Sequence, residues 1–244
     1  MELIIDEFCD NLPNKISFPN HGVFLGGSQS GKSTLIAKIL DNVTNVYTFP
    51  RYLNGRKSLV IISPAPTIEI SKIMTTNHEW DIIMYSSNDF GKSLLDELYT
   101  KWRTEDNCIN ILLIDDVLSS LRKREQYSCI NELYTYVRHL NVSVLSTMHC
   151  YDKCFKTIFQ NSGIVVIMYG PSITSSLRSV LYFNHFKGTS DIVRGLQKSY
   201  VNGMTIHDYI YINTSKEAFS GCQFYITNNL FNPKNGLTIK QFIF

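Results

Sequence analysis

Residues 26–33 read Gly-Gly-Ser-Gln-Ser-Gly-Lys-Ser, which completes the pattern G-x-x-x-x-G-K-[ST]. A short apolar run at 23–25 precedes this loop, and residues 34–40 are good helix formers with an apolar stripe. A strand, a glycine-rich loop and a helix in this order favour a phosphate-binding loop, because the glycines let successive N–H groups point at phosphate oxygens. An ordinary glycine turn before a helix is the alternative, and the complete pattern between two matching flanks argues against it.

The loop predicts a nucleoside triphosphate and a magnesium ion as ligands. Lys32 would reach the β- and γ-phosphates, and the hydroxyl of Ser33 would ligate Mg²⁺. The helix that follows adds about half a positive charge at its N-terminus. We therefore expect ATP and Mg²⁺ as cofactors, bound by Gly26, Gly27, Ser28, Gln29, Ser30, Gly31, Lys32, Ser33 and Thr34.

A second chemical signature stands at the end of a continuous apolar run. Residues 109–114 predict a strand covered on both faces, as in a parallel α/β sheet, and Asp115 and Asp116 follow it. Ligands bind at the carboxyl ends of such strands. Asp115 would hold Mg²⁺ directly or through a water, and Asp116 could accept a proton from an attacking water. The alternative is that the two acids begin a turn or cap a helix.

The rest of the chain predicts an α/β fold. Apolar and β-branched runs predict strands at 58–64, 81–85, 142–149 and 163–169, and helical spacing predicts helices at 94–102, 124–140, 171–182 and 189–200. Aromatic and β-branched residues at 207–212 and 222–227 predict a hairpin or paired edge strands. We expect three layers, with a mainly parallel central sheet between helices and a C-terminal β extension.

Length and charge bound the organisation. The 244 residues, 44% of them hydrophobic, are enough for one large domain. We expect a single P-loop domain at 1–244, with an irregular lead-in at 1–20, a nucleotide-binding core at 21–182, and a C-terminal helix and β extension at 183–244. The net charge of +2 is small for a passive nucleic-acid binder, so contact with DNA would use a local patch or a ring of copies.

Cysteine usage and the lengths of the apolar runs bound the compartment. The six cysteines include no C-x-x-C pair, and the other ligands that a metal site would need do not lie near His149, Cys150 and Cys154. Buried or unreactive free thiols in a reducing compartment explain the scattered cysteines better. The N-terminus is acidic without an apolar signal segment, and no run approaches the ~20 residues that span a bilayer. We expect a soluble, intracellular protein without a membrane span.

Two segments carry a family resemblance, Leu-Leu-Ile-Asp-Asp-Val at 112–117 and Arg-His-Leu-Asn-Val-Ser at 138–143. The loop at 26–33 precedes these segments, and the predicted strand at 142–149, which ends in polar residues, overlaps and follows the second one. With these features in this order, the chain resembles the DNA-packaging ATPases of poxviruses and other large or polinton-like DNA viruses, virophages included. These are a branch of the FtsK–HerA superfamily of ring-forming motors, in the ASCE division of P-loop NTPases. The resemblance covers about residues 20–227, and in the C-terminal strands it rests on pattern alone.

The resemblance implies a RecA-like, FtsK–HerA-like three-layer fold and a DNA motor. The implied activity is hydrolysis of ATP to ADP and phosphate, coupled to sequence-independent translocation of double-stranded DNA into a preformed viral capsid. The implied partners are further copies of the chain in a pentameric or hexameric ring, and a capsid vertex or other capsid protein. The implied location is the virus factory of an infected cell, with the virion as a further location.

The resemblance also implies roles for single residues. Asp115 would be the metal-associated acid, and Asp116 would stand where cellular relatives carry a longer glutamate that polarises water. Arg138 falls where the family has an arginine ahead of the polar-ended strand, which implies a finger that acts on a neighbour's site. A charge at a helix C-terminus or a salt bridge is the alternative for Arg138.

The end of the polar-ended strand departs from the family. The family usually carries a glutamine there that senses the γ-phosphate, and the corresponding residue is His149. Histidine can donate a hydrogen bond to phosphate or water, but it titrates near neutral pH. Thr147 or Ser146 could share the sensor role, and simple exposure to solvent is the alternative for His149.

Two other function classes stay open. A nucleotide kinase would carry an arginine-rich lid, and residues 183–200 contain only Lys187, Arg194 and Lys198. A non-motor NTP-binding switch or assembly factor is the other class, and no N-K-x-D-like base-reading element is found for a GTPase. The basic cluster at 121–124 is a candidate DNA contact, with a solvated helix start as the alternative.

Overall fold

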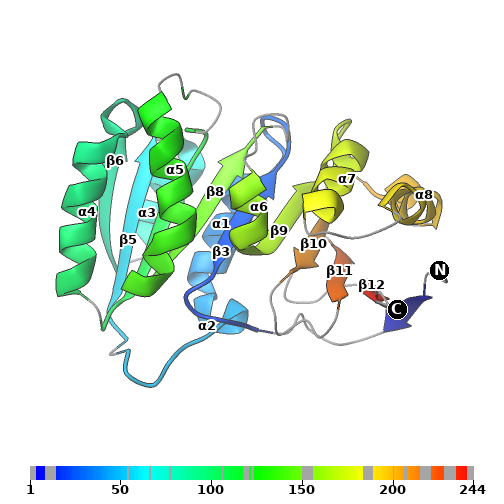
Figure 1. The fold of residues 1–244 in the computed structure, drawn as a ribbon, viewed down its shortest axis with the longest axis horizontal. Helices are drawn as coiled ribbons and strands as arrows, with labels where there is room; N and C mark the ends of the chain where they lie inside the picture. The colour runs from blue at the N-terminus through cyan, green and yellow to red at the C-terminus, as the bar shows by residue number, and fades with distance from the viewer. Residues whose placement is uncertain are drawn as a thin grey trace.

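The computed structural model describes residues 4–8, 15–53, 55–65, 67–76, 79–105, 107–117, 121, 124–149, 156–183, 189–199, 201–205, 208–214, 221–227 and 235–240. Ten strands of this part form one sheet in the order β1-β12-β11-β10-β9-β3-β8-β7-β5-β6 (Figure 1). They are β1 (Ile4–Phe8), β3 (His21–Leu25), β5 (Lys57–Ser63), β6 (Trp80–Ser86), β7 (Ile109–Ile114), β8 (Val142–Met148), β9 (Ser162–Met168), β10 (Tyr209–Asn213), β11 (Gly221–Thr227) and β12 (Asn235–Lys240). The short strands β2 (Ile16–Ser17) and β4 (Tyr47–Thr48) pair separately.

The order of the strands sets the position of the site. The six strands from β9 to β6 are parallel, and β10, β11, β12 and β1 continue the sheet with antiparallel pairings. Strand β8 lies between β3 and β7. β3 leads into the loop at 26–33, here called the glycine loop, and β7 leads into Asp115 and Asp116, here called the acid pair. Because parallel strands end at the same edge of a sheet, the loop and the acids meet at one edge with β8 between them.

Two helical layers cover the sheet (Figure 1). One face carries α1 (Lys32–Asp41), α2 (Val43–Val46) and α3 (Ile68–Thr76). The other face carries α4 (Lys92–Thr104), α5 (Arg124–Tyr136), α6 (Lys156–Asn161), α7 (Ile173–Phe183) and α8 (Thr189–Ser199). The described residues also form the short 3₁₀ helices η1 (Ser87–Asp89), η2 (Val137–Leu140) and η4 (Val201–Gly203). The three-layer α/β fold with a mainly parallel sheet is therefore confirmed.

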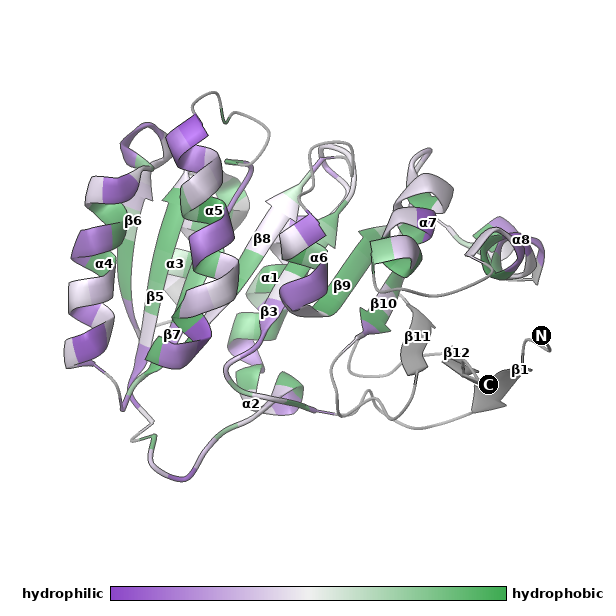
Figure 2. Ribbon diagram, in the orientation of Figure 1, coloured by the Kyte–Doolittle hydropathy of each residue, from purple (hydrophilic) through white to green (hydrophobic). Residues whose placement is uncertain are grey.

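Alternating strand residues fill two separate cores. Val60 and Ile62 of β5 pack on the side of α4 and α5, whereas Leu59 and Ile61 pack on the side of α1 and α3. A strand that is covered on both faces has to be apolar at consecutive positions, which explains the continuous runs in the sequence. Figure 2 shows β5 and β9 largely in the hydrophobic colour and hydrophilic residues on α4 and α5.

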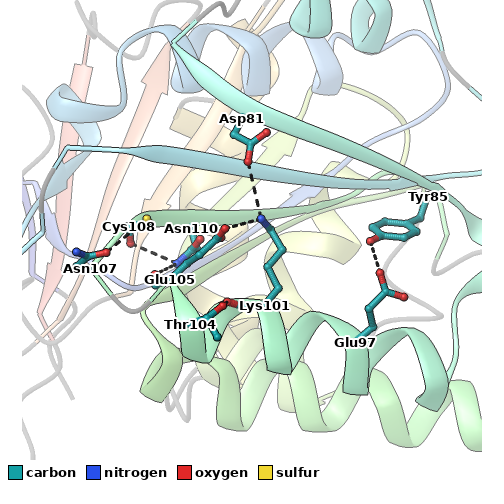
Figure 3. A network of polar contacts seen from close by, with 9 residues as sticks. All are labelled: Asp81, Tyr85, Glu97, Lys101, Thr104, Glu105, Asn107, Cys108 and Asn110. Atoms are coloured by element: carbon teal, nitrogen blue, oxygen red, sulfur yellow. Dashed lines mark hydrogen bonds and ion pairs between the residues drawn. The ribbon is translucent and has the colours of Figure 1, made fainter.

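Polar contacts fasten α4 to β6, which is an edge strand of the described sheet (Figure 3). The hydroxyl of Tyr85 donates to Glu97 at 2.8 Å. The Nζ atom of Lys101 lies 2.9 Å from Glu105 Oε1 and 3.8 Å from Asp81 Oδ2. Surface and partly buried polar contacts of this kind each contribute about 1 kcal/mol, so the buried apolar face of α4 supplies most of its attachment to the sheet.

Most predicted elements are confirmed, and one helix ends early. The predicted helix at 124–140 is wrong in its last turn, because α5 ends at Tyr136 and Val137–Leu140 form η2. Asn141 then takes a left-handed backbone conformation with φ of 55°, which ends the helical segment before β8 begins. Helical periodicity continues through such a 3₁₀ turn, and the sequence pattern alone therefore missed the boundary.

The ends of the described sheet also differ from expectation. Residues 4–8, expected within an irregular lead-in, form β1, which pairs with β12 so that Ile4 lies opposite Lys240. Neither strand was predicted from the sequence, and the pairing of β1 with β12 joins segments that are distant in sequence. The expected pairing of 207–212 with 222–227 is confirmed as the antiparallel pair β10–β11. No helix in the described part of the chain is long and apolar enough to cross a bilayer.

Candidate active site

A pocket of about 290 Å³ opens at the carboxyl ends of β3, β5, β7 and β8. Open α/β sheets bind their ligands at this edge. The pocket is lined by Ser28, Gln29, Ser30, Gly31, Lys32, Ser33, Thr34, Ser63, Pro64, Ala65, Thr67, Asp115, Asp116, Thr147 and His149. The structure therefore brings most of the predicted loop residues together with both acids and with the predicted sensor position.

The glycine loop depends on two left-handed backbone positions and on one close approach to β9. Gly31 has φ of 92° and Gln29 has φ of 59°, so the loop passes twice through the left-handed region. A Cβ atom on Gly26 would lie 2.7 Å from the Cβ of Met168 in β9, which leaves room for glycine alone. The N–H of Gly26 donates to the carbonyl of Met148 at 3.0 Å, and this bond ties the start of the loop to the end of β8.

Lys32 is folded back onto its own loop. Its Nζ atom donates to the carbonyl oxygens of Gly26 at 2.8 Å and Gly27 at 2.7 Å, and the residue is 8% exposed. Burial lowers the pKa of Lys32, while the charges of Asp116 and Asp115 oppose that shift. A phosphate in the pocket would offer the ammonium group a charged acceptor in place of two neutral carbonyls.

Asp115 is a buried carboxylate held by hydroxyl groups. Its N–H donates to the Ile62 carbonyl at 2.9 Å, so the β5–β7 ladder extends to this residue. Thr147 Oγ1 donates to Asp115 Oδ1 at 2.8 Å, and Ser33 Oγ lies 3.5 Å from the same oxygen. Burial raises the pKa of Asp115, the hydrogen bond from Thr147 opposes this, and the Asp116 and Lys32 charges act in opposite directions.

The donors around Asp115 fit a magnesium ion. Mg²⁺ prefers hard oxygen ligands and is commonly held by one or two carboxylates together with phosphate oxygens. Ser33 supplies a hydroxyl and Asp115 a carboxylate, 3.5 Å apart at one end of the glycine loop. A bound cation would also favour the charged form of a carboxyl group whose pKa burial has raised.

Asp116 is held through both its backbone and its side chain. The residue has φ of 55°, a left-handed conformation that is uncommon for a residue other than glycine. Its N–H donates to Thr147 Oγ1 at 2.8 Å. Its Oδ2 atom lies 2.9 Å from Nε2 of His149, and both side chains are about one third exposed, at 39% and 37%. The structure thus places His149 against the second acid, inside the pocket lining.

The two hydroxyl residues before His149 point to different places. Thr147 lines the pocket and contacts both acids, whereas Ser146 accepts a hydrogen bond from the hydroxyl of Tyr134 at 2.6 Å. Ser146 is fully buried in that contact. Because adjacent strand residues face opposite sides of a sheet, the suggestion that Ser146 shares the sensor role is wrong.

Arg138 does not line its own pocket. It lies in η2, before the first residue of β8, at the opposite end of that strand from His149. The seven residues of β8 put about 20 Å between the two ends. The guanidinium Nη2 of Arg138 donates to Asn161 Oδ1 at 3.0 Å.

The structure adds one segment and leaves other predicted residues undescribed. The pocket lining also includes Ser63, the last residue of β5, and Pro64, Ala65 and Thr67 after it. The stop of an apolar strand at residue 64 was the signal that could have found them. Arg122, Lys123, Cys150, Cys154 and Lys187 lie outside the described residues. No cluster of three or more His, Cys, Asp or Glu residues that could hold a metal occurs in the described part.

Comparisons with known proteins identify the fold. No protein-family model and no curated protein matches this sequence. B204, the DNA-packaging ATPase of Sulfolobus turreted icosahedral virus, has a TM-score of 0.55 at 11% identity, over 85% of this chain and 96% of that chain. The genome-packaging NTPase B204 of Sulfolobus turreted icosahedral virus 2, with AMPPCP bound, has a TM-score of 0.54 at 12% identity, over 85% and 96%.

A third solved structure shares the fold within a longer chain. EccC of Thermomonospora curvata, ATPases 2 and 3 with a signal sequence peptide, has a TM-score of 0.50 at 12% identity. The match covers 92% of this chain and 37% of that chain. At such identities the similarity concerns the fold, and the predicted P-loop NTPase architecture is confirmed.

Proposed function

We propose that this protein is an Mg²⁺-dependent ATPase that works as a ring of identical subunits. The ring would translocate double-stranded DNA into a preformed viral capsid. One observation carries the proposal: the glycine loop and the acid pair of β7 converge on a single pocket. The fold shared with the B204 packaging ATPases supports DNA as the transported substrate. The segments at 112–117 and 138–143 support the same choice.

The chemistry would consist of positioning and charge stabilisation. The oxygen of a water attacks the γ-phosphorus, the bond to the bridging oxygen of ADP breaks, and the water loses a proton. Lys32 and the loop N–H groups bind the developing negative charge, for which Lys32 gives up its bonds to Gly26 and Gly27. Asp116 orients the water and accepts its proton. Ser33 and Asp115 would hold Mg²⁺, which supplies further positive charge at the phosphates when bound.

His149 would act next to Asp116. Its 2.9 Å contact with Asp116 Oδ2 orients that carboxylate before nucleotide binds. Because His149 also lines the pocket, its imidazole can donate to a γ-phosphate oxygen once a nucleotide is present. The sensor role of the family's glutamine thus stays a prediction for His149, now with a defined partner.

The pocket lacks a second positive side chain among its described lining residues. Lys32 is the one lysine or arginine there, although phosphoryl transfer commonly uses an arginine finger as well. Arg138 stands at the far end of β8 and could therefore reach a site only on a neighbouring copy. This arrangement supports a ring, a pentamer or hexamer, in which each site is completed by the next subunit.

The contact with DNA should be directed at phosphates and independent of sequence, because a translocating motor moves over every sequence. The net charge of one chain is only +2, so a ring would sum small contributions from its copies. A capsid vertex or another capsid protein is the partner that the packaging role requires.

A nucleotide kinase is the alternative, and its arginine-rich lid finds no support, because Arg194 and Lys198 do not line the pocket. A non-motor NTP-binding assembly factor is the remaining alternative.

The direct test is phosphate release from ATP with and without double-stranded DNA, together with solution mass at increasing ATP. A motor should hydrolyse ATP faster with DNA and should increase in mass with nucleotide. Transfer of the γ-phosphate to a small acceptor would instead identify a kinase. Nucleotide binding without turnover, with or without DNA, would favour the assembly factor.

A further inference from the structure

We propose that Thr147 is a positioning residue, whose single hydroxyl joins the metal-binding side chain of Asp115 to the backbone of Asp116 and so sets the two acids in one fixed arrangement. The proposal rests on the proposed function, because it concerns the same site. It concerns a residue that the glycine loop and the acid pair do not identify, since Thr147 comes from the neighbouring strand β8.

The contacts of Thr147 reach both acids at normal hydrogen-bond length. Oγ1 lies 2.8 Å from Asp115 Oδ1 and 2.8 Å from the Asp116 backbone nitrogen. Thr147 is 1% exposed, so bulk water does not compete for these bonds. Because each contact is made by the same oxygen, a displacement of Thr147 moves both acids.

The chemistry of the groups fixes the direction of the two bonds. An amide N–H can only donate, so the Asp116 nitrogen donates to Oγ1. The hydroxyl has one proton, which remains for Asp115, and an ionised carboxylate can only accept. The chain therefore runs from amide to hydroxyl to carboxylate, and its last bond is strengthened by the carboxylate charge.

The backbone of Asp116 gives this chain a consequence for the second acid. A left-handed φ of 55° is costly for aspartate, by about 1–3 kcal/mol at strained sites in general, and persists where surrounding contacts hold it. The bond from the Asp116 N–H to Thr147 is such a contact. The Asp116 carboxylate contacts His149, which lies two residues after Thr147 at the end of β8.

Threonine suits this position better than other hydroxyl residues. Its β-branch restricts χ1 within a strand, which keeps the hydroxyl aimed at the acids. Outer-shell partners that orient metal ligands typically change metal affinity or activity by about 10- to 100-fold when removed. We therefore expect Thr147 to affect Mg²⁺ binding and turnover, although it touches neither nucleotide phosphate nor metal in this scheme.

The test compares Thr147→Val, which keeps the shape and loses the hydroxyl, with Thr147→Ser, which keeps the hydroxyl. Ser146→Ala is the matched control, since it removes a buried hydroxyl bond to Tyr134 from the same strand. Each full-length protein is titrated with Mg²⁺ at saturating ATPγS, and the melting temperature gives the half-saturating Mg²⁺ concentration. The kcat and KM for ATP are measured at saturating Mg²⁺.

Thr147→Val should raise the half-saturating Mg²⁺ concentration and lower kcat, each about 10- to 100-fold. Thr147→Ser should restore both, and Ser146→Ala should leave the Mg²⁺ requirement at the wild-type value. If Thr147→Val does not fold, Thr147→Cys, whose thiol is a weak donor, replaces it under the same criteria.

Two results would overturn the proposal and are distinguishable. An unshifted Mg²⁺ requirement in Thr147→Val, with a normal wild-type response, overturns the role of Thr147 and leaves the proposed ATPase standing. A wild-type protein that shows neither Mg²⁺-dependent stabilisation by ATPγS nor hydrolysis overturns the proposed function and this inference together.

Discussion

Asp116 shows how the site depends on single atoms. Its N–H is bound by Thr147 and its carboxylate by His149, so both the backbone and the side chain are oriented before a nucleotide is present. Aspartate is one methylene shorter than the glutamate that the resemblance led us to compare with it. The left-handed backbone at Asp116 and the contact from β8 are the features by which this chain would compensate for the missing length.

Asp116→Asn should separate ATP binding from hydrolysis. The amide keeps the size of the side chain but cannot accept a proton from water, so turnover should fall at least about 100-fold, the lower range for loss of general-base catalysis. The Kd for ATPγS should stay within about threefold, because Asp116 is not assigned to phosphate or metal. Measurement of phosphate release beside equilibrium binding checks both values. Equal loss of binding and turnover would give Asp116 a structural role instead.

His21 predicts a dependence of stability on pH. The residue is fully buried at the start of β3, and its Nδ1 accepts the N–H of Val144 at 3.0 Å. Burial, with the nearby charge of Arg138, lowers the pKa of His21 from 6.5 to about 3, while a contact with the Tyr134 backbone opposes the shift. The unfolded chain therefore binds a proton between these values that the folded chain does not bind.

The sign of the effect follows from this difference. The contribution of His21 to stability is complete above pH 6.5 and is lost as the pH falls toward 3. Its slope in that window should be about 1.4 kcal/mol per pH unit. His21→Asn, whose side-chain oxygen can accept the Val144 N–H, should remove this slope. Urea unfolding of both proteins at pH 7 and pH 5 measures it, and parallel pH profiles would contradict the prediction.

At the scale of elements, β3 and β9 pack closely around Asn20. The side-chain oxygen of Asn20 accepts the N–H groups of His21 and Gly163, each at 2.9 Å. A Cβ atom on Gly163 would lie 2.5 Å from that oxygen, and Asn20 cannot move away without losing both bonds. The close pairing of β3 and β9 at their amino ends, opposite the end that leads into the glycine loop, therefore depends on a glycine at 163.

Gly163→Ala should lower the free energy of unfolding by about 1–3 kcal/mol, the usual cost of overpacking. Gly195→Ala is the matched control, because a Cβ there meets nothing within 4 Å and the residue lies in α8. The control should be neutral or more stable by up to about 1 kcal/mol. Thermal and urea unfolding measure both variants, and an equal change in the two would show that the contact with Asn20 is unimportant.

The sequence predicts an element well when neighbouring residues determine it, and poorly when a distant partner does. The runs of β5 and β7 are buried on both faces, so consecutive apolar residues marked them. The loop at 26–33 and the acids at 115 and 116 needed one further fact, the parallel sheet, to be placed together. β1 escaped prediction because its partner strand lies more than 200 positions away, as Ile4 and Lys240 show.

The contacts within the site were less predictable than its members. His149 was expected near the γ-phosphate, but nothing in the sequence indicated its contact with Asp116, which depends on the left-handed backbone of that residue. The choice between Thr147 and Ser146 depended on which face of β8 each occupies. Only the register of β8 against β7 and β3 decides that question.

At the scale of the whole molecule, the position of Arg138 makes a prediction about assembly. If Arg138 completes a neighbour's site, mixing Arg138→Ala subunits with Lys32→Ala subunits should restore part of the ATPase activity, because some interfaces then combine an intact loop with an intact arginine. The ATP turnover of either variant alone should fall at least about 1,000-fold, if Arg138 has the usual effect of an arginine finger. Phosphate release against mixing ratio measures the rescue.

Asn161→Ala is the control for this experiment, since it removes the 3.0 Å contact of Arg138 within its own chain. That variant should keep its turnover if Arg138 works between subunits. Absence of rescue in rings that demonstrably contain both variants would contradict the finger role and give Arg138 a structural role, in which it joins η2 to α6 within its own chain.

The central claim is that ATP hydrolysis in this pocket drives movement along DNA. The most direct measurement is displacement of a third-strand oligonucleotide from double-stranded DNA, followed in the presence of ATP, ATPγS or no nucleotide. We predict displacement by the wild-type protein with ATP, none with ATPγS, and none by Lys32→Ala with ATP. Rapid ATP hydrolysis by the assembled protein on the same DNA, without any displacement of the third strand, would contradict the account.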